Sequence, residues 1–185
     1  MKKILLSTLA TITLLVSGCE FTKDKKATEY TEYIEAAMDA TYYGDSTKYV
    51  DVADTTVTEA KELYEHTIDY LAESIMLYND VSIDYISEET YKKYQDLAKE
   101  ALKKTKYTVN TAVKVDGIYQ VKVEIEPLDI WESTYDEVEE YIGKFNEKYP
   151  DYESMTDEEV LAAEEEYAKE VLEIITPYVE DIKYK

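Results

Sequence analysis

The sequence contains a single cysteine, Cys19, and no arginine among its 185 residues. One cysteine cannot form an intramolecular disulfide, so the fold must be stable without cross-links. The 20 basic residues are all lysine, and lysine does not make the bidentate contacts by which guanidinium groups hold phosphate or carboxylate ligands. These two absences exclude a disulfide scaffold and an arginine clamp for an anionic substrate.

Glycine and histidine are also scarce, with four glycines and one histidine in the chain. No G-x-G-x-x-G or P-loop pattern can be written from these glycines, so the sequence has no nucleotide-phosphate loop. The one histidine, His66, has no adjacent serine motif such as G-x-S-x-G, so nucleophilic catalysis finds no support. We therefore expect neither a cofactor nor an enzymatic activity of these kinds.

The first 19 residues have the order of a signal peptide that ends in a lipobox. Lys2 and Lys3 give a positive start, an apolar run follows over residues 4–16, and small residues at 17 and 18 precede Cys19. The run is shorter than the roughly 20 residues that a membrane span needs. The sequence therefore predicts a lipoprotein signal peptide at 1–18, cleavage before Cys19, and a diacylglyceryl group on the Cys19 thiol.

Removal of this leader would leave a strongly acidic protein. The formal charge of the whole chain is −22, and it becomes −24 without Lys2 and Lys3. Such a charge repels nucleic acid and anionic lipid headgroups, so we expect no nucleic-acid partner and attachment to the bilayer through acylated Cys19. We expect the protein at the outer face of the cytoplasmic membrane. Residues 19–27 would be the lipidated cysteine and a flexible tether, and 28–185 a single extracytoplasmic domain.

Apolar residues spaced three and four apart predict about five amphipathic helices. The first covers residues 28–44, and residues 45–55 are expected as an irregular connection. The last helix is expected to end at Pro177, because proline interrupts helices. The four later helices are predicted to begin at capping residues: Thr56, Ser87, Thr134 and Thr156.

Between the third and fourth helices the apolar period changes to two, which predicts a β-hairpin. Alternating residues run through 109–115 and 119–125 and are joined by Asp116-Gly117, a strong hairpin signal. Because a two-stranded hairpin alone is marginally stable in water, we expect a third strand at 178–185. The chain stops inside that pattern, which leaves a C-terminally incomplete sequence open. The predicted fold class is α+β, mostly helical, with the helices packed on a small antiparallel hairpin or sheet.

Aromatic residues supply the candidate ligand contacts. Tyrosine occurs 20 times, against two phenylalanines and one tryptophan, Trp131. Trp131 follows the second predicted strand and precedes a capped helix, where it could fill the core or flank a groove. If it contacts a ligand, we expect Tyr119 and Tyr135 to border the same cleft between hairpin and helix. The sequence leaves core and contact roles open for Trp131.

The single histidine belongs to a predicted helix that carries acidic residues at helical spacing. Glu62, His66 and Asp69 could offer a nitrogen and two oxygen ligands to a divalent metal. We favour a solvated acidic face, because ligands on one exposed helix lack the surrounding hydrogen bonds that fix a metal site. These three residues are weak candidates, and no metal is expected.

Several short segments resemble a family of small lipoproteins of Gram-positive Firmicutes whose function is uncharacterised. The resemblance covers most of residues 28–131, and no catalytic residue is carried over with it. It implies a cystatin-like or NTF2-like α+β domain, in which helices pack on a curved antiparallel sheet. The segments that carry it follow the lipobox: Tyr42-Tyr43-Gly44-Asp45, Glu89-Thr90-Tyr91-Lys92-Lys93-Tyr94, Gly117-Ile118-Tyr119-Gln120-Val121-Lys122-Val123 and Pro127-Leu128.

The sequence is compatible with three functional classes. The first is a non-enzymatic cell-surface lipoprotein that binds another envelope protein or a small ligand, and the sequence favours it. The second is an envelope enzyme that acts on glycan through paired carboxylates, which requires two carboxyl groups facing each other across a cleft. The third is a passive spacer or immunity-type surface protein without a ligand cavity.

Overall fold

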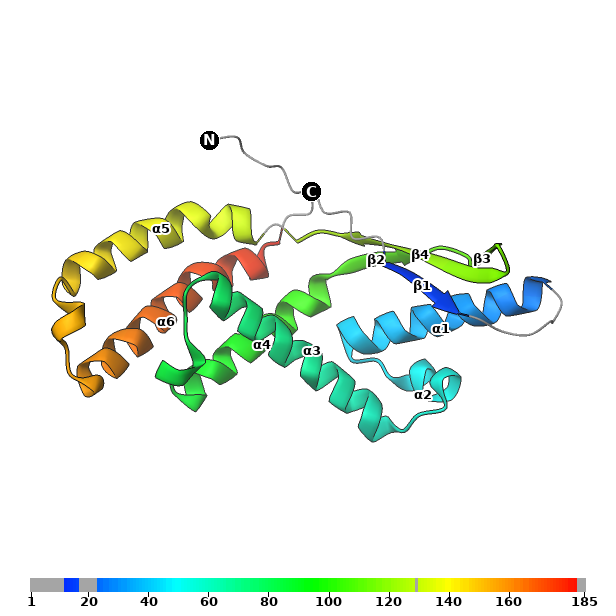
Figure 1. The fold of residues 1–185 in the computed structure, drawn as a ribbon, viewed down its shortest axis with the longest axis horizontal. Coiled ribbons are helices and arrows are strands. Elements are labelled where there is room, and N and C mark those ends of the chain that lie inside the picture. The colour runs from blue at the N-terminus through cyan, green and yellow to red at the C-terminus, as the bar shows by residue number, and fades with distance from the viewer. Residues whose placement is uncertain (1–11, 17–22, 129, 183–185) are drawn as a thin grey trace. The chain divides into compact units, whose positions relative to one another are not determined.

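The computed structural model describes residues 12–16, 23–128 and 130–182, and only the backbone of residues 12–16, 23, 24 and 131 (Figure 1). This part of the chain contains six α-helices and a four-stranded antiparallel sheet, so the predicted α+β class is confirmed. The chain divides into two compact units. Among the described residues, unit 1 comprises 12–16, 23–66 and 105–127, and unit 2 comprises 67–104, 128 and 130–182.

Unit 1 contains the sheet, whose central strand is β4 (Ile118–Glu126). Strands β2 (Lys106–Val109) and β3 (Val113–Val115) pair with β4 over residues 123–126 and 118–120. Strand β1 (Ile12–Val16) pairs with residues 119–123. The predicted hairpin at Asp116-Gly117 is confirmed, and φ values of 52° and 85° at these residues are what a two-residue hairpin turn needs.

The first strand of the predicted hairpin is interrupted between β2 and β3. Asn110 donates its N–H to the carbonyl oxygen of Lys122 at 2.8 Å, as a strand residue would. The N–H of Ala112 instead donates to the hydroxyl of Thr31 at 2.9 Å, and Ala112 is buried. The alternating pattern over 109–115 therefore contains a local break that the hydropathy pattern does not reveal.

Helix α1 (Lys23–Tyr43) packs across one face of the sheet (Figure 1). The side chains of Tyr119, Val121 and Val123 on β4 are at most 2% exposed and share a core with Ile34 of α1. The intervening residues of β4 are exposed or half-buried on the other face. This alternation is expected of a sheet that is covered on one side.

The start of α1 differs from the prediction. Residues 23–27, expected as part of a flexible tether, form the first turns of the helix. Ala27 packs against the core of unit 1, and its carbonyl oxygen accepts a hydrogen bond from the Thr31 hydroxyl at 2.7 Å. The segment is polar apart from this alanine, so it carries no apolar periodicity from which a helix could be predicted.

A short helix, α2 (Thr47–Ala53), replaces part of the irregular connection expected at 45–55. Gly44 ends α1 with φ of 68°, and the Asp45 carboxylate then accepts a hydrogen bond from the Thr47 N–H at 3.1 Å. None of the residues of α2 is buried. Because α2 has no buried apolar stripe, no apolar periodicity in the sequence predicts it.

Unit 2 is helical and is built around α6 (Asp157–Glu180), which lies against α4 (Glu88–Lys104) and α5 (Trp131–Lys148) (Figure 1). Helix α3 (Val57–Tyr78) belongs to unit 1 up to residue 66 and to unit 2 from residue 67. Single 3₁₀ turns lie at Ile83–Tyr85 and Tyr152–Ser154. The core of unit 2 includes the following fully buried residues: Ala72, Ile75, Tyr94, Ala98, Ala168, Val171, Ile175 and Val179.

The predicted capping boxes of α3 and α6 are confirmed. In α6 the Thr156 hydroxyl accepts from the Glu159 N–H, and the Glu159 carboxylate accepts from the Thr156 N–H at 2.8 Å. Helix α5 begins at residue 131, three residues before the predicted cap Thr134. The Thr134 hydroxyl is buried inside the helix and donates to the carbonyl oxygen of Ile130 at 2.9 Å. A threonine at this spacing can therefore bond its own helix instead of capping it.

The third strand predicted at 178–185 is wrong in its described part, because residues 178–180 continue α6. Pro177 cannot donate an N–H, but it does not end the helix. Val179 is fully buried, and the Asp181 N–H donates to the carbonyl oxygen of Pro177 at 3.0 Å. The burial of Val179 and this hydrogen bond stabilise the last turn of α6. Residues 183–185 lie outside the described residues.

Candidate functional site

The three predicted ligand-contact residues have different surroundings. Tyr119 of unit 1 is 2% exposed, and its ring centre lies 4.9 Å from that of Tyr30. Its ring is part of the core, which argues against a ligand contact. Tyr135 of unit 2 is 50% exposed and donates its hydroxyl to Glu139 at 2.7 Å. The side chain of Trp131, and Cys19 as a whole, lie outside the described residues.

The weak metal candidates do not form a ligand cluster. Glu62 and His66 are exposed, and the Asp69 carboxylate accepts a hydrogen bond from the Gln95 amide at 2.6 Å. Within residues 12–16, 23–128 and 130–182, no three His, Cys, Asp or Glu side chains are placed to hold a metal ion. The structure therefore lends no support to a metal at these positions.

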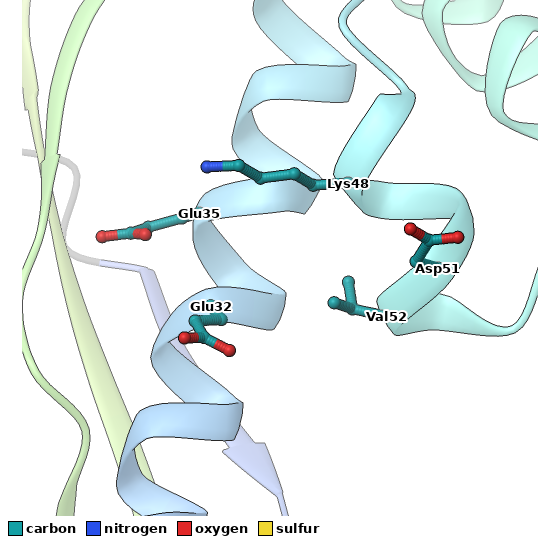
Figure 2. Close-up of a pocket in the computed structure, with 5 residues that line it drawn as sticks. All are labelled: Glu32, Glu35, Lys48, Asp51 and Val52. Carbon is teal, nitrogen blue, oxygen red and sulfur yellow. The ribbon is translucent and has the colours of Figure 1, made fainter.

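A hollow of about 350 Å³ lies between α1 and α2 of unit 1 (Figure 2). It is lined by Glu32 and Glu35 of α1 and by Lys48, Asp51 and Val52 of α2. Figure 2 shows Lys48 extending from α2 back toward α1 and Glu35 turned away from α2. Glu35 therefore does not face Asp51 across the hollow, as one of a pair of catalytic carboxyl groups would.

The connection between α1 and α2 positions this hollow. Gly44 has a φ of 68°, and a Cβ atom there would lie 2.8 Å from Cε1 of the Tyr64 ring. Only glycine fits this close approach without strain. The ring centres of Tyr33 on α1 and Tyr49 on α2 lie 6.2 Å apart, so aromatic packing also holds α2 beside α1.

Tyrosines pack between the end of α1 and strand β2. Tyr107 of β2 donates its hydroxyl to the Asp39 carboxylate, and the Tyr43 ring stacks on it with centres 5.6 Å apart. The Tyr43 hydroxyl donates to the carbonyl oxygen of Thr105 at 2.7 Å. Burial and the bond to Asp39 raise the pKa of Tyr107 well above its usual range, and the charge of Glu35 adds to this. Tyr107 is thus a protonated donor at neutral pH, with a structural role.

A second hollow, of about 360 Å³, lies in unit 2 beside the connection from α5 to α6. Lys148 there pairs with Glu166 at 2.5 Å and lies 5.2 Å from the centre of the Tyr149 ring. The Tyr149 hydroxyl donates to the same carboxylate at 2.9 Å. The charges of Lys148 and Glu166 therefore neutralise each other. The residues that line this hollow are the following: Lys148, Tyr149, Pro150, Asp151, Met155, Glu159 and Ala162.

Glu165 of α6 binds the N-terminus of α4. Its carboxylate accepts the Ser87 N–H at 2.7 Å, the Ser87 hydroxyl at 2.8 Å and the Thr90 hydroxyl at 2.7 Å. Lys169 pairs with it at 2.8 Å. Burial acts to raise the pKa of Glu165, but the bonds from Lys169, Ser87 and Thr90 outweigh burial and lower the pKa to about 2. This carboxylate is an ionised acceptor that joins two helices.

In the described chain, every carboxyl group with a shifted pKa has it lowered. The causes are hydrogen bonds from capping hydroxyls, backbone N–H groups and lysines. The general acid of a glycan hydrolase needs the opposite shift. None of these nine groups therefore has the raised pKa that such a general acid requires. The nine residues are the following: Asp45, Glu59, Glu89, Glu100, Glu124, Glu140, Glu159, Glu165 and Glu166.

The α1–α2 hollow was not predicted from the sequence. Three of its five lining residues belong to α2, which was expected as an irregular connection. The available signal was Gly44-Asp45-Ser46, in which a helix-ending glycine precedes two residues that favour helix starts. The contact of Glu165 has no local signal in the sequence, because its partners Ser87 and Thr90 are distant in sequence.

Comparison with known proteins finds no match to the chain among family models, curated proteins or solved structures. The resemblance to small lipoproteins of Gram-positive Firmicutes stays a prediction. In the part of the chain that the structure describes, no helix has the length and apolar character to cross a membrane.

Proposed function

We propose that this chain is a lipoprotein of the cell surface, anchored by a diacylglyceryl group on Cys19 at the outer face of the cytoplasmic membrane. In this proposal the folded part is a non-enzymatic module that binds another component of the cell envelope. The observation that carries the proposal is the order of the first 19 residues, a basic start, an apolar run and Val16-Ser17-Gly18-Cys19. Two acyl chains suffice for stable attachment, whereas one would be marginal.

The distribution of charge supports an anchor at this end of the chain. The whole chain carries a net −22, yet residues 20–27 contain three lysines and only two acidic residues. Lysines close to an anionic membrane surface are attracted to it, although Glu20 and Asp24 of the same segment offset part of this attraction. Lysine near the start of a helix is unfavourable for the helix dipole, and Lys25 and Lys26 belong to the first turns of α1. A nearby anionic surface would offset that cost.

The shifted carboxyl groups support a binding module over a glycan hydrolase. Their pKa values are lowered by hydrogen bonds from capping groups and lysines and, at Glu165, also from Ser87 and Thr90 at the start of another helix. A hydrolase needs one carboxyl group that stays protonated near neutral pH.

The anchor is tested by mass spectrometry of the protein purified from membranes of its native host. We expect a mature chain that begins at Cys19 and carries the mass of a diacylglyceryl group. A Cys19→Ala variant should keep residues 1–18 and lack the lipid mass. A wild-type chain with an intact leader, or with an unmodified thiol at Cys19, would refute the proposal.

The non-enzymatic part is tested with purified cell-wall glycan. Incubation with the mature protein should release no reducing ends above those from heat-inactivated protein. Release that an Asp51→Asn or Glu32→Gln variant abolishes would instead support the glycan-cleaving alternative.

A further inference from the structure

We propose that the mature protein binds an extended apolar segment of another polypeptide as an added strand along the edge of β4 over residues 119–123. The inference rests on the removal of the leader proposed above. In the structure this edge is occupied by β1, whose residues 12–16 lie inside the predicted signal peptide. Cleavage before Cys19 would remove β1 from the chain and leave the edge without its strand.

The direction of the backbone groups of β4 follows from one hydrogen bond. The carbonyl oxygen of Lys122 accepts the Asn110 N–H at 2.8 Å, on the edge occupied by β2 and β3. Successive residues of a strand direct their N–H and C=O groups to opposite edges. Val121 and Val123 therefore direct theirs to the edge occupied by β1. Without β1 these groups face outward as a template for pairing.

The sequence of β4 carries little protection along this edge. Natural edge strands are protected by proline, by bulges, by charged side chains such as lysine or by inward-pointing charges. Strand β4 contains no proline, and Pro127 follows its last residue. The break in pairing at 110–112 lies on the opposite edge, between β2 and β3. Lys122 is the only charged residue within 119–123.

The register specifies the chemistry of the occupant. Ile12, Leu14 and Val16 lie opposite Val123, Val121 and Tyr119. Opposite residues of an antiparallel pair share a face, and on this face the β4 side chains are at most 2% exposed beside α1. The occupant therefore needs apolar residues at alternate positions. Its other two positions lie opposite Lys122 and Gln120 and can be polar.

A foreign segment fits this edge better than a second copy of the chain. Two copies paired through β4 would bring together bodies that each carry a net charge of −24 after loss of Lys2 and Lys3 from the −22 chain. Like net charge opposes such association. An uncharged apolar segment does not meet this repulsion, as the apolar β1 sequence ITLLV illustrates.

The test uses the lipoprotein purified from membranes in detergent, with its N-terminus verified by mass spectrometry. The probe is a fluorescent peptide of residues 10–18 with two added lysines for solubility, and anisotropy reports binding. Leu14 lies opposite Val121 and directs its N–H toward β4, whereas Leu15 directs its N–H away. Methylation of the Leu14 nitrogen should weaken binding by about tenfold or more. Methylation of the Leu15 nitrogen is the matched control, and the affinity of this peptide should stay within about twofold of that of the unmethylated peptide.

A second comparison uses the full 185-residue chain produced without export, which keeps residues 1–18. Because β1 occupies the edge in that chain, the unprocessed chain should bind the peptide at least about tenfold more weakly than the processed protein does.

Absence of saturable binding to the processed protein, or equal binding of both methylated peptides, would overturn the inference and leave the proposed lipid anchor unaffected. A concentration-dependent dimer that the peptide does not dissociate would show that a second copy holds the edge. A leader found intact on the native protein would instead overturn the proposed function.

Discussion

Replacement of Glu165 by glutamine should destabilise unit 2 in a manner that depends on pH. Glutamine keeps the size of the side chain and one carbonyl oxygen for the Ser87 and Thr90 donors, but it removes the negative charge. It therefore resembles the protonated form of Glu165. The pKa shift measures how much more strongly the site holds the ionised form than the protonated one.

The magnitude follows from the shift of the pKa from 4.5 to about 2. At about 1.36 kcal/mol per unit, the ionised carboxylate contributes about 3 kcal/mol at pH 7. The pKa is lowered in the folded state, so this contribution is fully present above the unfolded value of 4.5 and is lost as pH falls toward 2. At pH 3 less than half of this contribution should remain. The Glu165 side chain is 21% exposed, so solvent screening reduces these values only in part.

Urea denaturation monitored by circular dichroism measures the difference. The free energy of unfolding of Glu165→Gln should lie about 3 kcal/mol below that of the wild type at pH 7, and the gap should narrow steadily as pH falls below 4.5. Glu173→Gln, on an exposed position of the same helix, is the control and should change stability by less than about 0.5 kcal/mol. A gap that stays constant from pH 7 to pH 3 would refute the assignment of this charge as the cap of α4.

Two other pairs of substitutions test the packing by the same unfolding assay. Gly44→Ala should lower the free energy of unfolding more than Gly117→Ala does. Both residues have positive φ, but only at Gly44 would a Cβ meet the Tyr64 ring, at 2.8 Å. If both substitutions lower the free energy of unfolding equally, by about 1 kcal/mol, this would show that the Tyr64 ring moves aside. Tyr94→Phe should cost about 1 to 2 kcal/mol, because the buried Tyr94 hydroxyl donates to a main-chain carbonyl at 2.7 Å. Tyr141→Phe should be neutral or stabilising, because the buried Tyr141 hydroxyl has no hydrogen-bond partner in the described chain, and a clear loss of stability would contradict this.

The helices other than α2, and the hairpin, could be predicted because their signals are local. The Thr156 and Glu159 side chains, three residues apart, fix the start of α6 by bonding each other's backbone. Asp116-Gly117 likewise encodes its turn within two residues. The end of α6 depends instead on the burial of Val179 in the core of unit 2, and the proline signal at Pro177 was therefore misleading.

The candidate sites could be predicted less well because their contacts are distant in sequence. Tyr119 was a contact candidate by composition, but α1 covers its ring through residues about 90 positions earlier. Glu165 lies in the acidic run Glu164-Glu165-Glu166, a pattern typical of a solvated helix face. In the structure Ser87 and Thr90, at the start of another helix, bind its carboxylate. Local periodicity indicates which face of a helix is apolar, whereas it does not indicate which polar residue of that helix finds a distant partner.

The segment at residues 12–16 shows why one short run can support two interpretations. A signal peptide needs an uninterrupted apolar run, and a strand beside a buried face needs apolar residues at alternate positions. The sequence Ile-Thr-Leu-Leu-Val meets both needs, since it lies within the apolar run and pairs with β4 in the structure. Pairing with β4 therefore does not conflict with export, because cleavage at Cys19 acts on the covalent chain outside that strand. Processing would then convert a sheet with an occupied edge into one with an open edge, which links the proposed anchor to the proposed binding of a partner strand.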